Sequence, residues 1–154
     1  MTETITARVE GLTVSYRAGD QRIVVAEDVC FELQRGRTLG LVGESGSGKS
    51  TVARTLLGHL REGSSVDRGT VTVFGEDVFS LPAERLRKLR GGMVALVSQN
   101  AGHALTPSMR VGAQIREALA VHGLPSGDDR IVDLLRLVRL PSPLGPRVRL
   151  LSLL

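Results

Sequence analysis

The first part of the chain alternates apolar and polar positions in a way that predicts strands. Residues 5–16 and 22–33 mix β-branched with polar residues, and Gly19-Asp20 lies between them as a turn signal. Two such runs joined by a short turn predict an antiparallel hairpin. A further alternating run over residues 69–74 predicts an edge strand.

Two other short runs are apolar at nearly every position. They are residues 38–42 and residues 93–97. An unbroken apolar run of this length is typical of a strand that is buried on both faces, as in the parallel sheet of an α/β protein. The pattern therefore predicts two core strands at these positions.

Helical signals mark four segments. They are residues 50–60, 80–90, 111–122 and 131–138. Within three of them apolar residues recur three or four positions apart, which predicts amphipathic helices. In the second, Ser80 is the predicted cap and Pro82 lies in the first turn. Asp128-Asp129 predicts the start of the last helix, because negative charge there is favoured by the helix dipole.

The composition fits a globular chain and argues against a nucleic-acid surface. The 154 residues are 42% hydrophobic and 23% charged, with a formal net charge of +4. Aromatic residues make up only 3%, and the basic residues are dispersed along the chain. Recognition of single strands depends on bases stacked on aromatic side chains. We therefore expect no nucleic-acid partner.

The histidines and the single cysteine predict no chemistry. His59, His103 and His122 are far apart in the sequence, which favours surface or helix-face positions. Cys30 stands among apolar strand residues, where a buried, unreactive thiol is the commoner case. One cysteine cannot form an internal disulfide, the N-terminus has no targeting pattern, and no apolar run approaches the roughly 18 residues of a membrane span. We expect a cytoplasmic protein.

One motif carries chemistry. The phosphate-loop pattern is met by Gly43, Glu44, Ser45, Gly46, Ser47, Gly48, Lys49 and Ser50. Backbone N–H groups in such a loop form an anion nest, which the positive end of the following helix reinforces. Lys49 would neutralise the β- and γ-phosphates, the Ser50 hydroxyl would ligate Mg²⁺, and Thr51 would contact the α-phosphate. The alternative is a chance glycine-rich turn, which the predicted strand before the loop and the helix after it disfavour.

With this loop in place, the chain resembles the ATP-binding subunits of ABC transporters, specifically those of dipeptide, oligopeptide and nickel importers. The stretches that carry the resemblance are residues 9–16, 39–51, 69–75, 97–100, 104–107 and 109–115. The resemblance implies an α/β fold of the P-loop NTPase (ABC ATPase) type, with an N-terminal β-hairpin layer, an incomplete parallel core sheet and the start of a helical subdomain. The corresponding parts are a partial nucleotide-binding core at 1–107, the helical start at 108–140 and an irregular tail at 141–154.

The resemblance also implies roles for single residues. Tyr16 matches the aromatic residue on which the adenine ring stacks, although an ordinary strand tyrosine is the alternative. Gln99 matches the catalytic glutamine whose side-chain carbonyl reaches Mg²⁺ and the attacking water, and the end of a strand is a sensible place for it. The implied cofactors are ATP and Mg²⁺. The implied partners are membrane-spanning permease subunits and a second ATP-binding subunit, at the inner face of the cell membrane.

The resemblance stops before the residues that complete hydrolysis. The family uses a Leu-Ser-Gly-Gly-Gln-like signature, an acidic pair after a hydrophobic strand and a later histidine, whereas this sequence reads Leu151-Ser152-Leu153-Leu154. We therefore expect a C-terminally truncated, marginally stable chain with negligible turnover. The main hypothesis is the ATP-binding component of a peptide or nickel importer. The alternatives are a nucleotide-binding but inactive fragment or pseudogene product, and a different phosphate-loop enzyme such as a small kinase, which the regions around Tyr16 and Gln99 disfavour.

Overall fold

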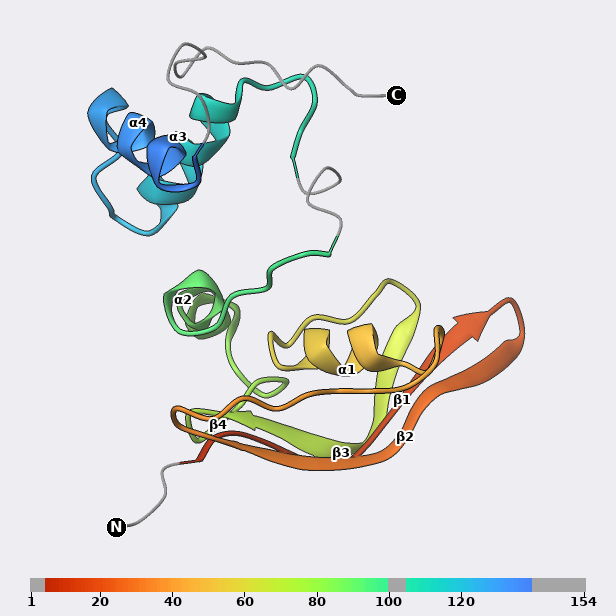
Figure 1. Ribbon diagram of the computed structural model, residues 1–154. Helices are drawn as coiled ribbons and strands as arrows, with labels where there is room; N and C mark the ends of the chain where they lie inside the picture. Colours follow the sequence, from red (N-terminus) through yellow and green to blue (C-terminus); the bar gives the residue numbers. More distant parts are fainter. Residues whose placement is uncertain (1–4, 100–104, 140–154) are drawn as a thin grey trace. The chain divides into compact units, whose positions relative to one another are not determined.

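The computed structural model describes residues 5–99 and 105–139 (Figure 1). The chain divides into two compact units, Met1–Leu96 and Val97–Leu154. The tail predicted to be irregular, residues 141–154, lies outside the described residues, and so does His103.

An antiparallel sheet forms the base of the first unit. Its strands are β1 (Ile5–Ala18), β2 (Gln21–Gln34), β3 (Ser64–Val73) and β4 (Glu76–Asp77), in the spatial order β2-β1-β3-β4. The predicted hairpin is confirmed, because β1 and β2 pair along their length and turn at Gly19-Asp20. The third strand begins five residues earlier than predicted and is not an edge strand, since it pairs with β1 on one side and with the short β4 on the other.

The apolar face of this sheet is covered by helices, and Figure 1 shows α1 lying over it. The fully or nearly fully buried core residues are Ala7, Val9, Leu12, Val14, Ala26, Val52, Val71, Val73, Val78 and Leu89. Of these, Val52 comes from α1 (Lys49–Thr55) and Leu89 from α2 (Ala83–Gly92). The helix predicted over 50–60 is thus shorter, because the chain leaves helical geometry after Leu56 and continues as a turn. Val52 thus packs α1 onto the core of the sheet.

The second helix departs from its prediction at both ends. Pro82 is its N-cap, whereas the Ser80 hydroxyl donates to Asp77 Oδ2 at 2.9 Å and caps nothing. Near the other end, Arg90 has a ψ of 125° and leaves helical geometry. Its guanidinium reaches the turn that follows α1, where Nε donates to the Leu57 carbonyl at 2.7 Å.

The two predicted core strands are not formed. Residues 38–42 and 93–97 have no strand geometry, and the exposed fractions are 42% for Leu39 and 93% for both Val42 and Val97. A strand buried on both faces needs hydrogen-bonding neighbours and apolar cover. Among the described residues these runs find no such strand partner, and all paired strands are antiparallel. The predicted parallel core sheet is therefore absent from the described residues. One isolated parallel bridge, between Arg90 and Val94, joins positions only four residues apart and is a local contact at the end of α2.

The second unit contains two helices at the predicted places. They are α3 (Val111–Val121) and α4 (Asp128–Leu137). Asp128 and Asp129 lie in the first turn of α4, as predicted, and Asp128 also forms an ion pair with Arg116 of α3. Ile131 is completely buried. Across the described ranges, every helix is too short or too polar for a membrane crossing.

Candidate phosphate-binding site

The glycine-rich loop over residues 43–48 leads directly into α1. Gly48 is the N-cap residue of this helix, with a φ of 83°, and its carbonyl accepts from the Val52 N–H at 2.9 Å. A Cβ at this position would lie 2.2 Å from the carbonyl oxygen of Val25 in β2. The loop is therefore seated directly on the backbone of β2, which only a glycine permits.

Lys49 folds back into the loop. Its ammonium donates to the Gly43 carbonyl at 2.8 Å, to the Glu44 carbonyl at 2.5 Å and to Ser47 Oγ at 3.2 Å. An ammonium group has three donors, so these three acceptors match its hydrogen-bonding capacity. The arrangement places one positive charge inside the curve of the loop, with oxygen acceptors that a phosphate group could replace.

The loop is accessible to a ligand. Residues 43–47 and Ser50 are exposed, and Gly48, Lys49 and Thr51 are half-buried. Mg²⁺ in nucleotide sites keeps several waters and takes few protein ligands besides the phosphates. The exposed Ser50 hydroxyl, one residue after Lys49, fits such a ligand. No cluster of three or more His, Cys, Asp or Glu side chains that could hold a metal by itself occurs in the described ranges.

Tyr16 and the phosphate-loop helix line one cavity. Tyr16, at the end of β1, and Thr51, in α1, both border a cavity of about 180 Å³. These two residues were predicted separately, and the structure brings them together. The cavity is also bordered by Arg54, His59 and Arg61, for which the sequence carries no motif. His59 is exposed, as predicted, whereas the role of Tyr16 stays a prediction.

Gln99 lies outside the unit that contains the phosphate loop. It belongs to the second unit and lies at an exposed bend. The prediction that it ends a strand is wrong, because residues 93–97 form none. Its role toward Mg²⁺ and water stays a prediction.

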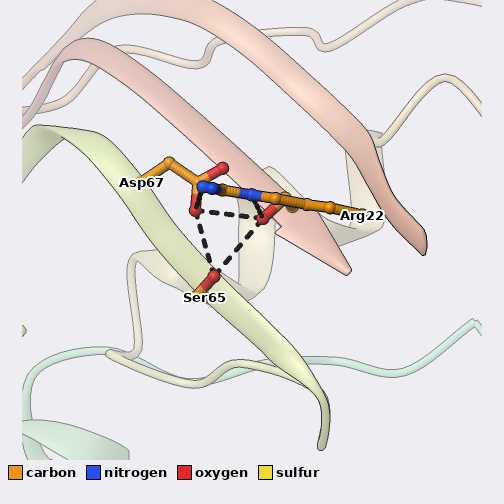
Figure 2. Close-up of polar contacts among 4 residues, drawn as sticks. Arg22, Ser65 and Asp67 are labelled. Carbon is orange, nitrogen blue, oxygen red and sulfur yellow. Dashed lines mark hydrogen bonds and ion pairs between the residues drawn. The ribbon is translucent and has the colours of Figure 1, made fainter. Parts of the chain in front are cut away.

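A polar network on the sheet was not predicted from the sequence (Figure 2). Arg22 Nε donates to Ser15 Oγ at 2.8 Å, and the hydroxyls of Ser15 and Ser65 each donate to Asp67 Oδ1 at 3.0 Å. Arg22 also forms an ion pair with Asp67. The hydrogen bond from Arg22 lowers the pKa of Asp67, and the hydroxyls of Ser15 and Ser65 lower it by smaller amounts. The network joins β1, β2 and β3, and its member in β1, Ser15, directly precedes Tyr16.

Neighbours along a strand point to opposite faces, so Ser15 and Tyr16 serve different faces of the sheet. The cavities agree, because Ser15 and Arg17 border one while Tyr16 borders another. The network therefore lies on the opposite face of the sheet from Tyr16 and does not border its cavity. The same alternation corrects the prediction for Cys30, whose side chain is exposed and accepts from the Gly11 N–H at 3.1 Å.

The glycine-rich loop, its lysine and the helix that follows define a phosphate-loop protein. The sequence model of the family described as ABC transporter matches residues 26–152. The chain belongs to the ABC transporter family, and the predicted family is confirmed.

Sequence relatives give the same assignment. A Brucella abortus (strain 2308) protein that carries the name of a peptide import ATP-binding protein is 42% identical over 136 residues, which are 86% of this chain and 41% of the relative. The oligopeptide transport ATP-binding protein OppD of Escherichia coli (strain K12) is 39% identical over 114 residues, covering 74% of this chain and 34% of OppD. The chain spans about two fifths of the length of the Brucella relative.

The fold is shared with solved ATP-binding cassettes. One of them, a dimer in a post-hydrolysis state bound to ADP and Pi, superimposes with a TM-score of 0.72 at 20% identity, over 92% of this chain and 60% of the other. This likeness shows the fold alone, and it confirms the predicted fold class.

Proposed function

We propose that this chain binds ATP through its phosphate loop, as the nucleotide-binding portion of the ATP-binding subunit of an ABC importer. The observation that carries the proposal is the position of Lys49, whose ammonium is held inside an exposed loop by three oxygen acceptors. A cation enclosed in this way lies ready to exchange its loop contacts for phosphate oxygens. Charge-assisted hydrogen bonds of this kind are about twice as strong as neutral ones.

The rest of the loop supports the same role. Gly46 faces open space, since a Cβ there would meet nothing within 4 Å. Phosphate oxygens can therefore approach the backbone on that side without a side chain in the way. The Ser50 hydroxyl would hold Mg²⁺ together with the phosphates, and the metal would supply neutralisation of the triphosphate charge. Thr51, the next residue, borders the cavity that Tyr16 also borders.

The transported substrate and the partners are inferred from the relatives. The two named above are a peptide import and an oligopeptide transport ATP-binding protein. We extend this to peptide import for the present chain, with membrane-spanning permease subunits and a second ATP-binding subunit as partners at the cytoplasmic face of the membrane. Deleting the gene in its host and measuring uptake of a labelled oligopeptide tests the extension, and unchanged uptake contradicts it.

Nucleotide binding is tested by removing the loop ammonium. Lys49→Ala is compared with the wild type in a titration with a fluorescent ATP analogue and Mg²⁺. Because a hydrogen bond to a charged group contributes about 1.5–3 kcal/mol, we expect the dissociation constant to rise about 10- to 100-fold. Equal binding by both proteins overturns the proposal.

The chain provides a matched control. Lys49 and Lys88 are its only lysines. Lys88 lies on α2 and forms an exposed pair with Glu84 at 3.0 Å. Lys88→Ala therefore removes the same charge from a surface position, where such a pair contributes little. It should bind the analogue like the wild type.

A further inference from the structure

The cavity beside Tyr16 has a second wall that the phosphate-loop assignment does not use. The Arg61 guanidinium lies over the Tyr16 ring, with its Cζ 5.5 Å from the ring centroid. This distance falls within the range of cation–π contacts. Arg61 is exposed and follows α1 in the loop that leads to β3. A long exposed side chain thus covers the aromatic face that borders the cavity.

The other side of the cavity leads to the phosphate loop. Thr51 and Arg54 of α1 border the same space of about 180 Å³. If the triphosphate of a nucleotide lies in the loop, this cavity is therefore the adjacent space that its base can occupy. Close to the ring the backbone at Gly63 leaves no spare room, since a Cβ there would come within 3.3 Å of Tyr16. The Tyr16 ring therefore lies close to the backbone at Gly63 and also meets the Arg61 guanidinium.

We propose that Arg61 is a base-contacting residue, which holds the nucleobase against Tyr16 by stacking on the base's outer face. The inference rests on the proposed function, because it places the base from the phosphate loop. Stacked atoms lie about 3.5 Å apart, so a base between the ring and the guanidinium needs a separation of about 7 Å. From 5.5 Å, Arg61 moves outward by about 1.5 Å, which its long exposed side chain allows.

The stacking chemistry of Tyr16 and Arg61 determines which nucleotides this contact favours. A guanidinium is planar and stacks on aromatic faces, which an ammonium does not do. Stacking between two planes uses the π-face that every base has, and it reads no hydrogen-bonding edge. Arg61 therefore strengthens binding of any purine nucleoside triphosphate and does not choose between adenine and guanine.

The experiment compares ligands with and without a base. The dissociation constants of ATP, GTP and inorganic tripolyphosphate are measured by calorimetry for the wild type, Arg61→Ala and Arg61→Lys. Loss of one stacking plane should weaken ATP and GTP about five- to tenfold, and equally, while tripolyphosphate binding stays unchanged. Arg61→Lys should behave like Arg61→Ala. Arg87→Ala, which removes an exposed arginine of α2, is the matched control.

Tyr16 supplies a second, direct measurement. The chain has one tyrosine and no tryptophan, so its intrinsic fluorescence reports on Tyr16 alone. ATP should change this emission after correction for nucleotide absorption, whereas tripolyphosphate should not. ATP that binds without altering the emission shows that its base lies elsewhere and overturns the proposal.

The remaining outcomes separate the two proposals. Unchanged ATP binding by Arg61→Ala refutes the stacking role. Equal losses for ATP and tripolyphosphate show that Arg61 acts as a charge on the phosphates, which also refutes it. Full rescue by lysine shows that a point charge is sufficient, and it refutes stacking by the planar guanidinium. If Lys49→Ala leaves tripolyphosphate binding intact, the phosphate-loop assignment itself fails.

Discussion

The contact between the phosphate loop and β2 is tested most sharply by comparing two glycines of the same loop. Gly46 and Gly48 both have a positive φ, of 86° and 83°. They differ in their surroundings, because a Cβ at Gly46 meets nothing within 4 Å while a Cβ at Gly48 lies 2.2 Å from Val25 O. Alanine at each position therefore pays the cost of a positive φ, and only Gly48→Ala adds a steric clash.

The expected magnitudes follow from these two terms. An L-residue in the left-handed region costs about 1–2 kcal/mol, and this cost is common to both variants. The change in the entropy of the unfolded chain on replacing glycine by alanine is also common and cancels in the comparison. The clash at Gly48 is with a backbone carbonyl, which cannot rotate away, so α1 or β2 must shift at a cost of about 1–3 kcal/mol. Gly48→Ala should thus be less stable than Gly46→Ala by about 1–3 kcal/mol.

The assay is urea unfolding followed by far-ultraviolet circular dichroism, with the free energy of unfolding extrapolated to water. Both variants are measured beside the wild type in one buffer without nucleotide. A lower urea midpoint for Gly48→Ala than for Gly46→Ala supports the close contact between the loop and the backbone of β2. Identical midpoints refute it, because the strain shared by the two positions would then account for the whole effect.

Two further predictions concern side chains that tie elements together. Arg90 donates to the carbonyls of Leu57 and Gly58 at 2.7 and 2.8 Å, so Arg90→Ala should lower the free energy of unfolding by about 1.5–3 kcal/mol. Arg90→Lys should restore only part of the lost stability, since an ammonium lacks the planar fork that spans both carbonyl oxygens. Equal stability of the wild type and both variants in urea unfolding contradicts this prediction. The pKa of Asp67 is lowered, chiefly by its hydrogen bond from Arg22. The ionised Asp67 therefore stabilises the folded protein fully above the ordinary aspartate pKa, and this stabilisation is lost as the pH falls through the lower pKa of the folded state. Asp67→Asn should therefore be less stable than the wild type at neutral pH and lose less stability on acidification, and parallel pH profiles of the urea midpoint would count against the network.

The predictions that succeeded rest on local signals. The hairpin of β1 and β2 follows from alternating residues around a Gly-Asp turn, and α3 and α4 follow from apolar periodicity and from the acidic start at Asp128. The phosphate-loop motif is equally local, since its glycines, lysine and serine are consecutive, and the role of these residues toward nucleotide stays a prediction. In each case the residues that determine the structure are neighbours in the sequence.

The predictions that failed depend on distant partners. Residues 38–42 and 93–97 have the composition of core strands, yet a parallel strand exists only where another strand supplies its hydrogen bonds, and the described residues supply none. Cys30 was misplaced for a related reason. Its apolar neighbours predict burial, whereas the pairing of β2 decides which face its side chain occupies.

The sequence by itself determined the phosphate-loop motif, because eight consecutive residues carry the chemistry of phosphate binding. It also predicted the family, through several stretches between residues 9 and 115. Only the tertiary structure decided what surrounds that loop. It seats Gly48 on β2, brings Tyr16 and Thr51 to one cavity and lays Arg61 over the aromatic ring. The physical reason is that these contacts join residues from separate elements, and their approach depends on the register of β1, β2 and β3 and on the packing of α1 against them.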